Sequence, residues 1–441
     1  MKVYLRVFLF LTLLLNCQCS PTAIPLGIAA AEGENEQAST PSQLVILDSD
    51  QTESADGEKP RPNALRLILP PVIYALTDLE TNVYFDNTFL ALNPDNYGVD
   101  VVCARGAQQN ERWTWKPSTD PQKKDLGEHS FTLELRDDTN RVVTSATTLI
   151  RVANRSVDAP LEKPVTLLII GDSLTNASVY SQQVLDLANE DQLPLKLIGT
   201  RGPGAEAQEG GGDGLGNRHE GYGGWTAERF ATKYNAGIAR GGPYKECGSP
   251  FIYKDEPKNE EEAPKLDFAR YCAEFNEGNA PDFVTILLGC NDTFNATDES
   301  IDERIDIMFA HYETLVAMIH ALNPQTRIGA ILPMPPAATQ EAFGANYGSG
   351  QTRWQYLRNQ HRVLERMLET FGNREGENLF LLPAWLNLDP VHGFPSHTEK
   401  AHARTETEVV RQINGVHPSA EGYRQLGDSL YAWLRSFDDQ E

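Results

Sequence analysis

The sequence contains a serine hydroxyl and an imidazole of the kind that nucleophilic acyl chemistry requires. Ser173 ends the tripeptide Gly171-Asp172-Ser173, which follows the apolar run Val165–Ile170. A serine becomes an effective nucleophile when a neighbouring base accepts its proton. His417 lies late in the chain, just before a predicted helix, where the helix dipole favours a neutral imidazole that can accept a proton. A Gly-Asp-Ser tripeptide by itself is more often only a turn, so the rest of the chain must indicate whether Ser173 is a nucleophile.

Two further segments supply donors for a negatively charged oxygen. Gly224 lies in the glycine-rich segment His219–Thr226, where a missing side chain lets the backbone N–H approach a bound oxygen. Asn291 follows the apolar run Phe283–Leu288 and can donate its side-chain amide. The N–H of Ser173 is a third donor, because the first N–H groups of a helix have no partner within the helix. Preorganised donors of this kind stabilise the oxyanion of an acyl-transfer transition state.

The pattern of residues 164–438 predicts alternating strands and helices, and this fold must position the candidate nucleophile, base and donors. Apolar runs predict strands at Val165–Ile170, Leu195–Gly199, Phe283–Leu288, Ile328–Leu332 and Leu379–Leu382. Apolar residues at helical spacing predict helices over Ile301–Leu322, over Trp354–Phe371 with Gly372 at the end, and over Tyr423–Leu434 with Ser419 as the cap. This order predicts a three-layer α/β/α, flavodoxin-like domain with a mainly parallel sheet. Ligand sites lie at the carboxyl edge of such sheets, where the candidate residues fall.

Four blocks in order along the chain resemble those of the SGNH, or GDSL, hydrolase superfamily, which is named for these residue types. The blocks are Gly171-Asp172-Ser173, Gly224, Gly289-Cys290-Asn291-Asp292 and His417. The resemblance covers Val165 to Ser436. The chain lacks a glycine two residues after the serine, which argues against the Gly-x-Ser-x-Gly elbow of α/β-hydrolases.

The resemblance implies that the chain hydrolyses esters. It implies Ser173 as nucleophile and His417 as general base and then acid. The N–H groups of Ser173 and Gly224 and the Asn291 amide would form the oxyanion hole, with Asp172 and Asp292 supporting it. No metal and no cofactor are expected for this chemistry.

One position departs from the family pattern. The family usually has aspartate three residues before the histidine, and here that position is Asn414. An amide oxygen can accept the Nδ1–H bond of His417, but it cannot offset the charge of an imidazolium. Three interpretations stay open: a Ser–His pair oriented by Asn414 or a backbone carbonyl, rescue by another carboxylate such as Asp389, or a binding protein that has lost catalysis.

Residues 64–154 have a different pattern. Apolar residues alternate at period two, as in Trp113 with Trp115 and Phe131 with Leu133, and Asp137-Asp138-Thr139-Asn140 is typical of a hairpin turn. We expect a small all-β, antiparallel sandwich of immunoglobulin type. Its tryptophans are expected in the core rather than on a sugar-stacking face.

The pattern of the first 63 residues predicts a signal peptide followed by a flexible linker. A basic start followed by the apolar run Val7–Leu15 is too short to span a bilayer and is typical of a signal peptide over residues 1–19. A lipoprotein acylated at Cys17 is the alternative. Residues 20–63 are acidic and polar and predict a flexible linker. A net charge of −24 argues against nucleic acid or anionic membrane as a partner. We therefore expect a secreted or periplasmic protein without a stable membrane span, and the sequence leaves its oligomeric state open.

The remaining cysteines and histidines carry weaker expectations. Cys247 and Cys272 form the candidate pair for a disulfide, whereas Cys290 is expected to be a buried thiol. His392, His397 and His402 recur every five residues, which is not the spacing of a metal site. His219 is expected in a flexible loop, at the surface or against substrate.

Long loops over residues 201–219, 238–279 and 333–353 are expected to surround Ser173. They carry Tyr, Phe, Asn and Arg rather than a long apolar stripe, which predicts a shallow polar cleft. The favoured substrate is a short acyl ester, foremost an acetyl ester, on a polysaccharide or a small molecule, by analogy with secreted carbohydrate esterases. The alternatives are a lipase or thioesterase acting on longer acyl chains, and a glycan-binding protein without activity.

Overall fold

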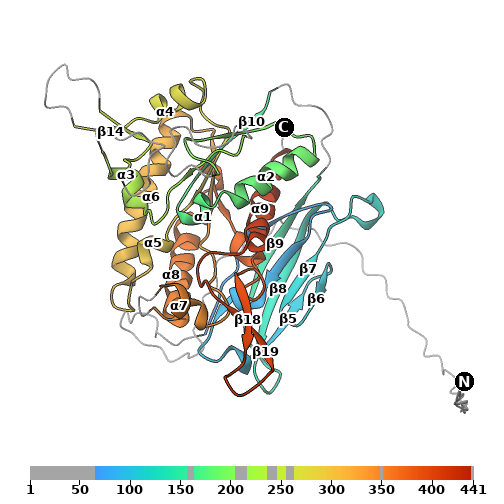
Figure 1. Ribbon diagram of the computed structural model, residues 1–441. Coiled ribbons are helices and arrows are strands. Elements are labelled where there is room, and N and C mark those ends of the chain that lie inside the picture. The colour runs from blue at the N-terminus through green and yellow to red at the C-terminus, as the bar shows by residue number, and fades with distance from the viewer. Residues whose placement is uncertain are drawn as a thin grey trace, which may run out of the picture. The chain divides into compact units, whose positions relative to one another are not determined.

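The computed structural model describes residues 65–155, 163–203, 216–235, 246–254, 263–347 and 351–438. The predicted signal peptide and linker lie outside these residues. Within them, the chain forms a layered α/β domain and an all-β region (Figure 1).

A parallel sheet organises the α/β domain. Its 6 strands include the path β11 (Leu195–Ile198), β10 (Val165–Gly171), β15 (Phe283–Leu287), β16 (Arg327–Ile331) and β17 (Leu379–Leu382), and β12 (Glu220–Gly221) pairs with β10. All of these pairings are parallel. The order is that of flavodoxin-like folds, with the chain reversing direction across the sheet between β10 and β15. The five strands predicted from apolar runs are confirmed, each to within one residue at either end.

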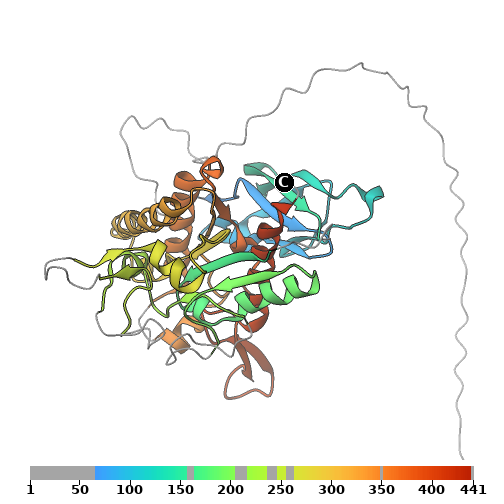
Figure 2. The ribbon, with the colours of Figure 1, turned by 90° about the horizontal axis from the view of Figure 1, so that it is seen from above.

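Helices cover both faces of this sheet, as the alternation of elements predicts (Figures 1 and 2). On one face α2 (Val179–Glu190) packs against α9 (Ala420–Arg435), and the other face carries α3 (Ala227–Thr232), α4 (Phe268–Phe275), α6 (Ile301–Leu322) and α8 (Arg353–Phe371). Ser419 caps α9 by accepting a hydrogen bond from the Gly422 N–H, and Gly372 follows α8. The three-layer fold class is therefore confirmed.

One helix of the described residues, α6, is long and apolar enough to cross a membrane by length and composition. In this domain it packs in the core through buried residues that include Ile305, Met308 and Leu315. Its Tyr312 hydroxyl donates a 3.2 Å hydrogen bond to the Ile286 carbonyl of the sheet. Core helices of this length pass the same test, so the finding is only a weak indication of a membrane span.

The all-β region contains two main sheets. One has the order β2 (Val72–Leu76), β9 (Val142–Ala153), β8 (Gly127–Arg136), β5 (Gly98–Val102), and the other β3 (Thr81–Tyr84), β7 (Arg112–Trp115), β6 (Ala107–Gln108). The predicted hairpin turn joins β8 to β9, and Trp113 and Trp115 are buried in the core. The predicted all-β region with antiparallel pairing is confirmed for four pairings of these two sheets, and one pairing differs, because β2 and β9 pair in parallel. Most of the region's chain separates these two strands, so no short turn fixes their relative direction.

Several short elements were not predicted. The hairpin of β18 (Ser396–Lys400) and β19 (Glu408–Gln412) is one, and α4 and α7 (Glu341–Tyr347) occupy parts of segments expected to be loops. Short helices gain most of their stability from tertiary packing, so a local pattern does not reveal them.

The predicted disulfide was also wrong. Cys247 and Cys272 are both buried, and no disulfide joins them. A disulfide requires two cysteines whose Cα and Cβ atoms meet in a narrow geometry, which spacing along the chain does not reveal. The buried thiol predicted at Cys290 is confirmed, with its sulfur 3.0 Å from the Tyr356 hydroxyl.

Candidate active site

The structure brings Ser173 and His417 together. Ser173 Oγ lies 2.8 Å from His417 Nε2, although the two residues come from opposite ends of the domain's sequence. Ser173 is the first residue of α1 (Ser173–Asn176), immediately beyond β10, and His417 lies just before the cap of α9. Burial lowers the pKa of His417 below its ordinary value, so the imidazole is neutral near pH 7. This pair has the geometry of a hydroxyl nucleophile with its general base.

The turn that carries Ser173 is fixed by close packing. A side chain at Gly171 would place its Cβ 2.0 Å from Thr175 Oγ1, so only glycine lets α1 approach the end of β10. Asp172 caps α1, because its Oδ1 accepts a 2.9 Å hydrogen bond from the Leu174 N–H. Ser173 is thereby held at a helix start, where its own N–H has no partner within the helix.

Asn291 lies beside this turn on α5 (Cys290–Thr293), directly after β15. Its Nδ2 donates to Asp172 Oδ2 at 2.9 Å and to the Trp225 carbonyl at 3.1 Å. Both amide hydrogens are therefore engaged, and the longer bond to Trp225 is the one that an oxyanion would replace most easily. Burial, with a smaller contribution from Asp292, raises the pKa of Asp172 to about 7.

Gly224 lies in a tight turn in which the Trp225 N–H donates to the Tyr222 carbonyl at 3.1 Å. Its φ of +72° is a backbone conformation that favours glycine. Gly224 is exposed, and its N–H donates to no residue of the described ranges. The turn is anchored to the nucleophile's strand, since the Tyr222 N–H donates to the Gly171 carbonyl at 2.9 Å. An exposed, unengaged N–H on an anchored turn is suited to bind a developing oxyanion.

Asp292 joins the turn to α5. Its Oδ1 accepts a 3.1 Å hydrogen bond from the Ala227 N–H at the start of α3, directly after the Gly224 turn. Burial raises the pKa of Asp292 to about 6. Trp225 and Ala227, which follow Gly224, are thus connected by direct hydrogen bonds to Asn291 and Asp292 of the third sequence block.

A buried carboxylate that the sequence reasoning missed, Glu220, fixes the other side of this turn. Its Oε1 accepts hydrogen bonds from the Thr200 N–H at 2.8 Å and the Tyr271 hydroxyl at 2.6 Å. Its Oε2 accepts from the Thr200 hydroxyl at 2.7 Å and the Tyr222 hydroxyl at 2.8 Å. Burial raises the pKa of Glu220, which the four donors oppose. Two of its three partners, Thr200 and Tyr271, come from distant segments, so only its place in the glycine-rich segment pointed to it in the sequence.

The expectation for His219 was wrong, because it is neither at the surface nor in reach of substrate. Its side chain is fully buried. Nδ1 accepts a hydrogen bond from the Gly221 N–H at 3.1 Å, and Nε2 lies 2.7 Å from the Ser178 hydroxyl. Burial and the nearby Arg201 lower the pKa of His219 to about 3, so this ring stays neutral and holds the start of the loop.

A small apolar cluster, separate from the main core, supports both Asn291 and His417. Its buried members are Cys290, Phe343, Tyr356 and Val416. Cys290 directly precedes Asn291, and Val416 directly precedes His417. Aromatic rings from α7 and α8 therefore fill the space beneath both polar residues.

Asn414 shapes the turn that presents the imidazole. Its Oδ1 accepts hydrogen bonds from the Val416 N–H at 3.1 Å and the His417 N–H at 2.9 Å. Asp389, the alternative orienting residue, caps a turn of its own by accepting from the N–H groups of Val391 at 2.8 Å and His392 at 2.9 Å. Orientation of the ring by Asn414 stays a prediction.

We expect Asn414→Ala to lower kcat for ester hydrolysis by about tenfold, because the loop loses the acceptor for two N–H groups. Asn414→Asp keeps both bonds and should retain the activity of the unchanged protein. Steady-state kinetics on p-nitrophenyl acetate measures both variants. An equal loss of kcat in Asn414→Ala and Asn414→Asp would show that the Asn414 side chain does not act as the acceptor for these two N–H groups.

No group of three or more His, Cys, Asp or Glu side chains is placed to hold a metal ion among the residues that the structure describes. Of the regularly spaced histidines, His397 pairs with Glu399 at 3.1 Å, and His402 Nδ1 accepts a hydrogen bond from the Arg404 N–H at 3.2 Å. His397 lies on the exposed β18–β19 hairpin.

Comparison with a model of a known protein family agrees with this fold. A family model described as the GDSL-like Lipase/Acylhydrolase family matches residues 169–425, which is more than half of the chain. The chain therefore belongs to this family of ester-bond hydrolases, and the resemblance seen in its four sequence blocks is confirmed. No curated protein matches the sequence significantly.

Solved structures of carbohydrate esterases are similar to the chain at low identity. A family 3 carbohydrate esterase from Clostridium thermocellum has 14% identity and a TM-score of 0.36, over 61% of this chain and 94% of that one. A family 3 carbohydrate esterase from Talaromyces cellulolyticus has 15% identity and a TM-score of 0.34, over 63% and 99%. A carbohydrate acetylesterase family member from Sinorhizobium meliloti has 14% identity and a TM-score of 0.34, over 62% and 97%.

Proposed function

We propose that this protein is a secreted serine esterase that removes short acyl groups, foremost acetyl groups, from carbohydrate. The observation that carries the proposal is the 2.8 Å contact between Ser173 Oγ and His417 Nε2, beside a turn rich in hydrogen-bond donors. Membership of an ester-hydrolase family supports the reaction class. The signal-peptide pattern in residues 1–19 supports secretion.

The reaction follows from these groups. Ser173 Oγ attacks the ester carbonyl carbon while His417 Nε2 takes the hydroxyl proton. The carbonyl oxygen becomes an oxyanion that accepts hydrogen bonds from the N–H groups of Ser173 and Gly224 and from Asn291 Nδ2. Collapse of the intermediate expels the alcohol, which receives the proton from His417, and leaves an acyl group on the serine. Water, deprotonated by the same imidazole, then releases the carboxylic acid and restores the hydroxyl.

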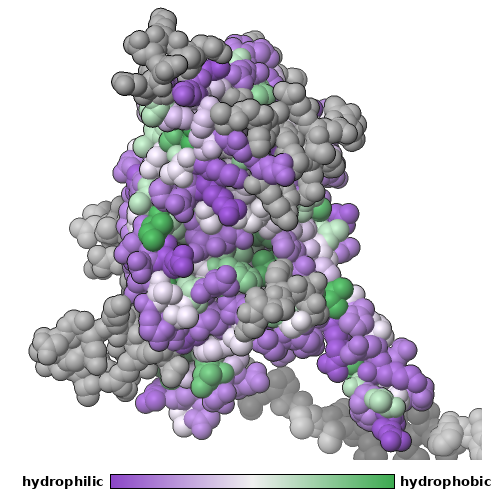
Figure 3. Space-filling model, turned by 60° about the vertical axis from the view of Figure 1, so that its left-hand side comes forward, coloured by the Kyte–Doolittle hydropathy of each residue, from purple (hydrophilic) through white to green (hydrophobic). Residues whose placement is uncertain are grey.

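The preference for a short acyl group on a polar alcohol rests on the polarity of the surface. The face of the molecule shown in Figure 3 is mostly hydrophilic, and its hydrophobic residues are scattered rather than joined into a long apolar surface. The loops that the sequence predicts around Ser173 carry polar and aromatic residues rather than a long apolar stripe. A long acyl chain needs a continuous apolar surface to bury, whereas an acetyl group does not.

The test is release of acetate from acetylated xylan, acetylated pectin and acetylated peptidoglycan, together with a series of p-nitrophenyl esters from acetate to dodecanoate. We expect acetate release from at least one polymer and rates that fall as the acyl chain lengthens. High activity on octanoyl and dodecanoyl esters with none on acetate would favour a lipase instead. Failure of a fluorophosphonate probe to label the folded protein would favour a binding protein, because such a protein has no activated serine.

A further inference from the structure

The loop that carries His417 depends on a second segment for its position. We call residues 412–419 the histidine loop and residues 383–395 the bridging segment. The Ser419 N–H, at the end of the histidine loop, donates a 2.8 Å hydrogen bond to the Gly393 carbonyl of the bridging segment. The Gly393 N–H donates in turn to the Asp389 carbonyl at 3.0 Å. A displacement of the bridging segment would therefore move the residues around His417.

The bridging segment is bound by one buried asparagine of the all-β region. Asn87, on the short helix η1 (Phe85–Asn87), is only 2% exposed. Its Nδ2 donates to the carbonyls of Trp385 and Leu388, each at 2.8 Å. The Trp385 indole N–H donates back to the Asn87 carbonyl at 3.0 Å. One residue of the all-β region thus makes three hydrogen bonds to the segment that holds the histidine loop.

A second asparagine of the all-β region extends this contact to α9. The backbone N–H and Nδ2 of Asn82 both donate to Asn387 Oδ1, at 2.9 and 3.0 Å. Asn387 Nδ2 donates to the Gln425 carbonyl of α9 at 3.0 Å, and the Gln425 Oε1 accepts from the Asp389 N–H at 2.9 Å. The bridging segment is therefore held between the all-β region on one side and α9 on the other.

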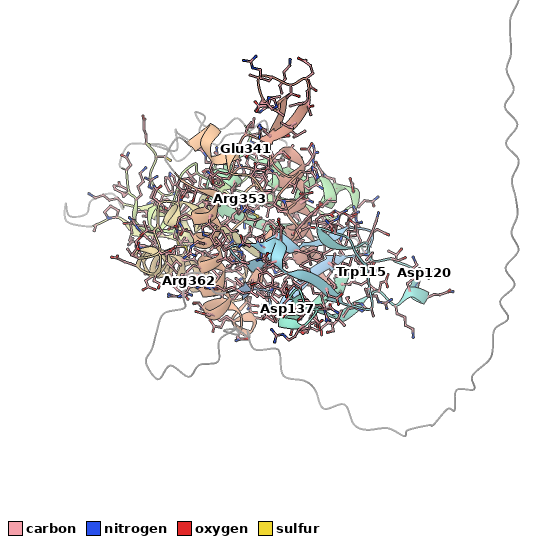
Figure 4. The ribbon with its side chains drawn as sticks, turned by 90° about the horizontal axis from the view of Figure 1, so that it is seen from below. Trp115, Asp120, Asp137, Glu341, Arg353 and Arg362 are labelled. Carbon is pink, nitrogen blue, oxygen red and sulfur yellow. The ribbon has the colours of Figure 1, made fainter. Side chains whose placement is uncertain are left out.

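An ion pair joins the all-β region to α8 as well. Arg66 of β1 (Arg66–Leu67) lies 3.3 Å from Glu365, which also pairs with Arg362 at 3.1 Å. Figure 4 labels Arg362 on α8 and Trp115 on the all-β region. The all-β region is thus attached to the hydrolase domain at several places, and at one of them Asn87 binds two backbone carbonyls of the bridging segment directly.

We propose that Asn87 is a positioning residue for His417, so that the all-β region acts as a fixed brace of the active site. This inference rests on the proposed function. Asn87 does not touch the reacting atoms, and acts through the bridging segment and the histidine loop. Without its two donated bonds, the carbonyls of Trp385 and Leu388 lose their partners in a buried place, which favours a shift of the segment.

The sharpest variant is Asn87→Asp, which keeps the shape of the side chain and replaces its two amide donors by a carboxyl group that has at most one. With the histidine loop less firmly held, His417 becomes more accessible to water, and its pKa rises toward the ordinary value near 6.5. We expect kcat to fall about tenfold to a hundredfold, as misplacement of a catalytic group by a fraction of an ångström can produce. KM should stay within about twofold, and the acid limb of the pH–rate profile should move to higher pH.

The direct readout is an NMR titration of His417 in the full chain with labelled histidine, its signal assigned by comparison with His417→Gln. The unchanged protein should titrate below 6.5 and Asn87→Asp at higher pH. The titration needs no turnover, so it tests the positioning role of Asn87 separately from the proposed esterase function. If the protein hydrolyses no ester but the titration shifts, the proposed function fails and the positioning role stands.

Two further variants make the test decisive. Trp385→Phe removes the indole donor from the opposite side of the contact and should give a smaller shift of the same sign, and it decides the matter if Asn87→Asp does not fold. Leu133→Ala opens a cavity at a fully buried position on β8, away from the bridging segment. It should lower the melting temperature without moving the titration. An unchanged titration and kcat in folded Asn87→Asp or Trp385→Phe, or an equal shift in Leu133→Ala, would overturn the proposal.

Discussion

Replacement of Ser173 by alanine is expected to abolish hydrolysis of p-nitrophenyl acetate. The Ser173 hydroxyl is the nucleophile that the 2.8 Å contact with His417 activates, and without it no acyl group can be transferred to the protein. In serine hydrolases, loss of the nucleophile costs about a millionfold in kcat, and the small remaining rate comes from the oxyanion hole and from binding. We therefore expect a fall of at least about ten thousandfold, with the same melting temperature as the unchanged protein.

A matched serine on the next helix provides the control. Ser181 on α2 is fully buried, and its hydroxyl has no hydrogen-bond partner in the described part of the chain. Ser181→Ala should keep full activity and full labelling by a fluorophosphonate probe, whereas Ser173→Ala should lose both. Unchanged turnover in Ser173→Ala would remove the mechanism, whatever the geometry of the pair.

The parts of the fold that follow from local pattern were predictable. The central strands are short apolar runs because helices cover both faces of the sheet, and Leu167 to Ile170 of β10 have no exposed surface. Ser173 and Asn291 each follow such a run, so their meeting at the carboxyl edge could be expected from topology alone. The pairing of Ser173 with His417 needed one further step, the recognition of ordered blocks.

What the sequence did not reveal depends on contacts between distant segments. Glu220 is recognisable as a structural residue only when Thr200, Tyr222 and Tyr271 surround it. His219 reads as a loop residue until Ser178 and Gly221 are seen to engage both of its nitrogens. Period and spacing report which face of an element is buried, but they carry no information on which polar groups meet there.

In the all-β region, too, the sequence pattern did not reveal which polar groups meet. Its alternating strands predicted a separate domain, and the hydrogen bonds of Asn82 and Asn87 to the bridging segment show how closely it is joined to the hydrolase domain. Both asparagines lie in a stretch of the sequence that mixes polar and aromatic residues, and nothing in their spacing distinguishes them from surface residues. Buried asparagines that bind backbone carbonyls become visible only in three dimensions.

Removal of the Asn291 amide is expected to have the second largest effect. Asn291→Ala should lower kcat by about a hundredfold to a thousandfold, as loss of one preorganised oxyanion donor does, with little change in KM. The donor contributes mainly when charge develops on the carbonyl oxygen, because in the resting site its hydrogens bind Asp172 and the Trp225 carbonyl. The measurement is kcat and KM on p-nitrophenyl acetate, with circular dichroism to confirm folding.

The variant also leaves the buried Asp172 carboxylate without its amide partner, so a structural contribution has to be separated from the catalytic one. A tetrahedral phosphonate ester binds through the same oxyanion contacts, so its second-order labelling rate should fall in parallel with kcat. Mere loss of packing would lower the melting temperature without a parallel fall of the labelling rate and kcat. Asn295→Ala, at an exposed position that follows α5, should match the unchanged protein in both measurements. Full activity in Asn291→Ala would show that the Asn291 amide is not an oxyanion donor. The N–H groups of Ser173 and Gly224 would then carry that role alone.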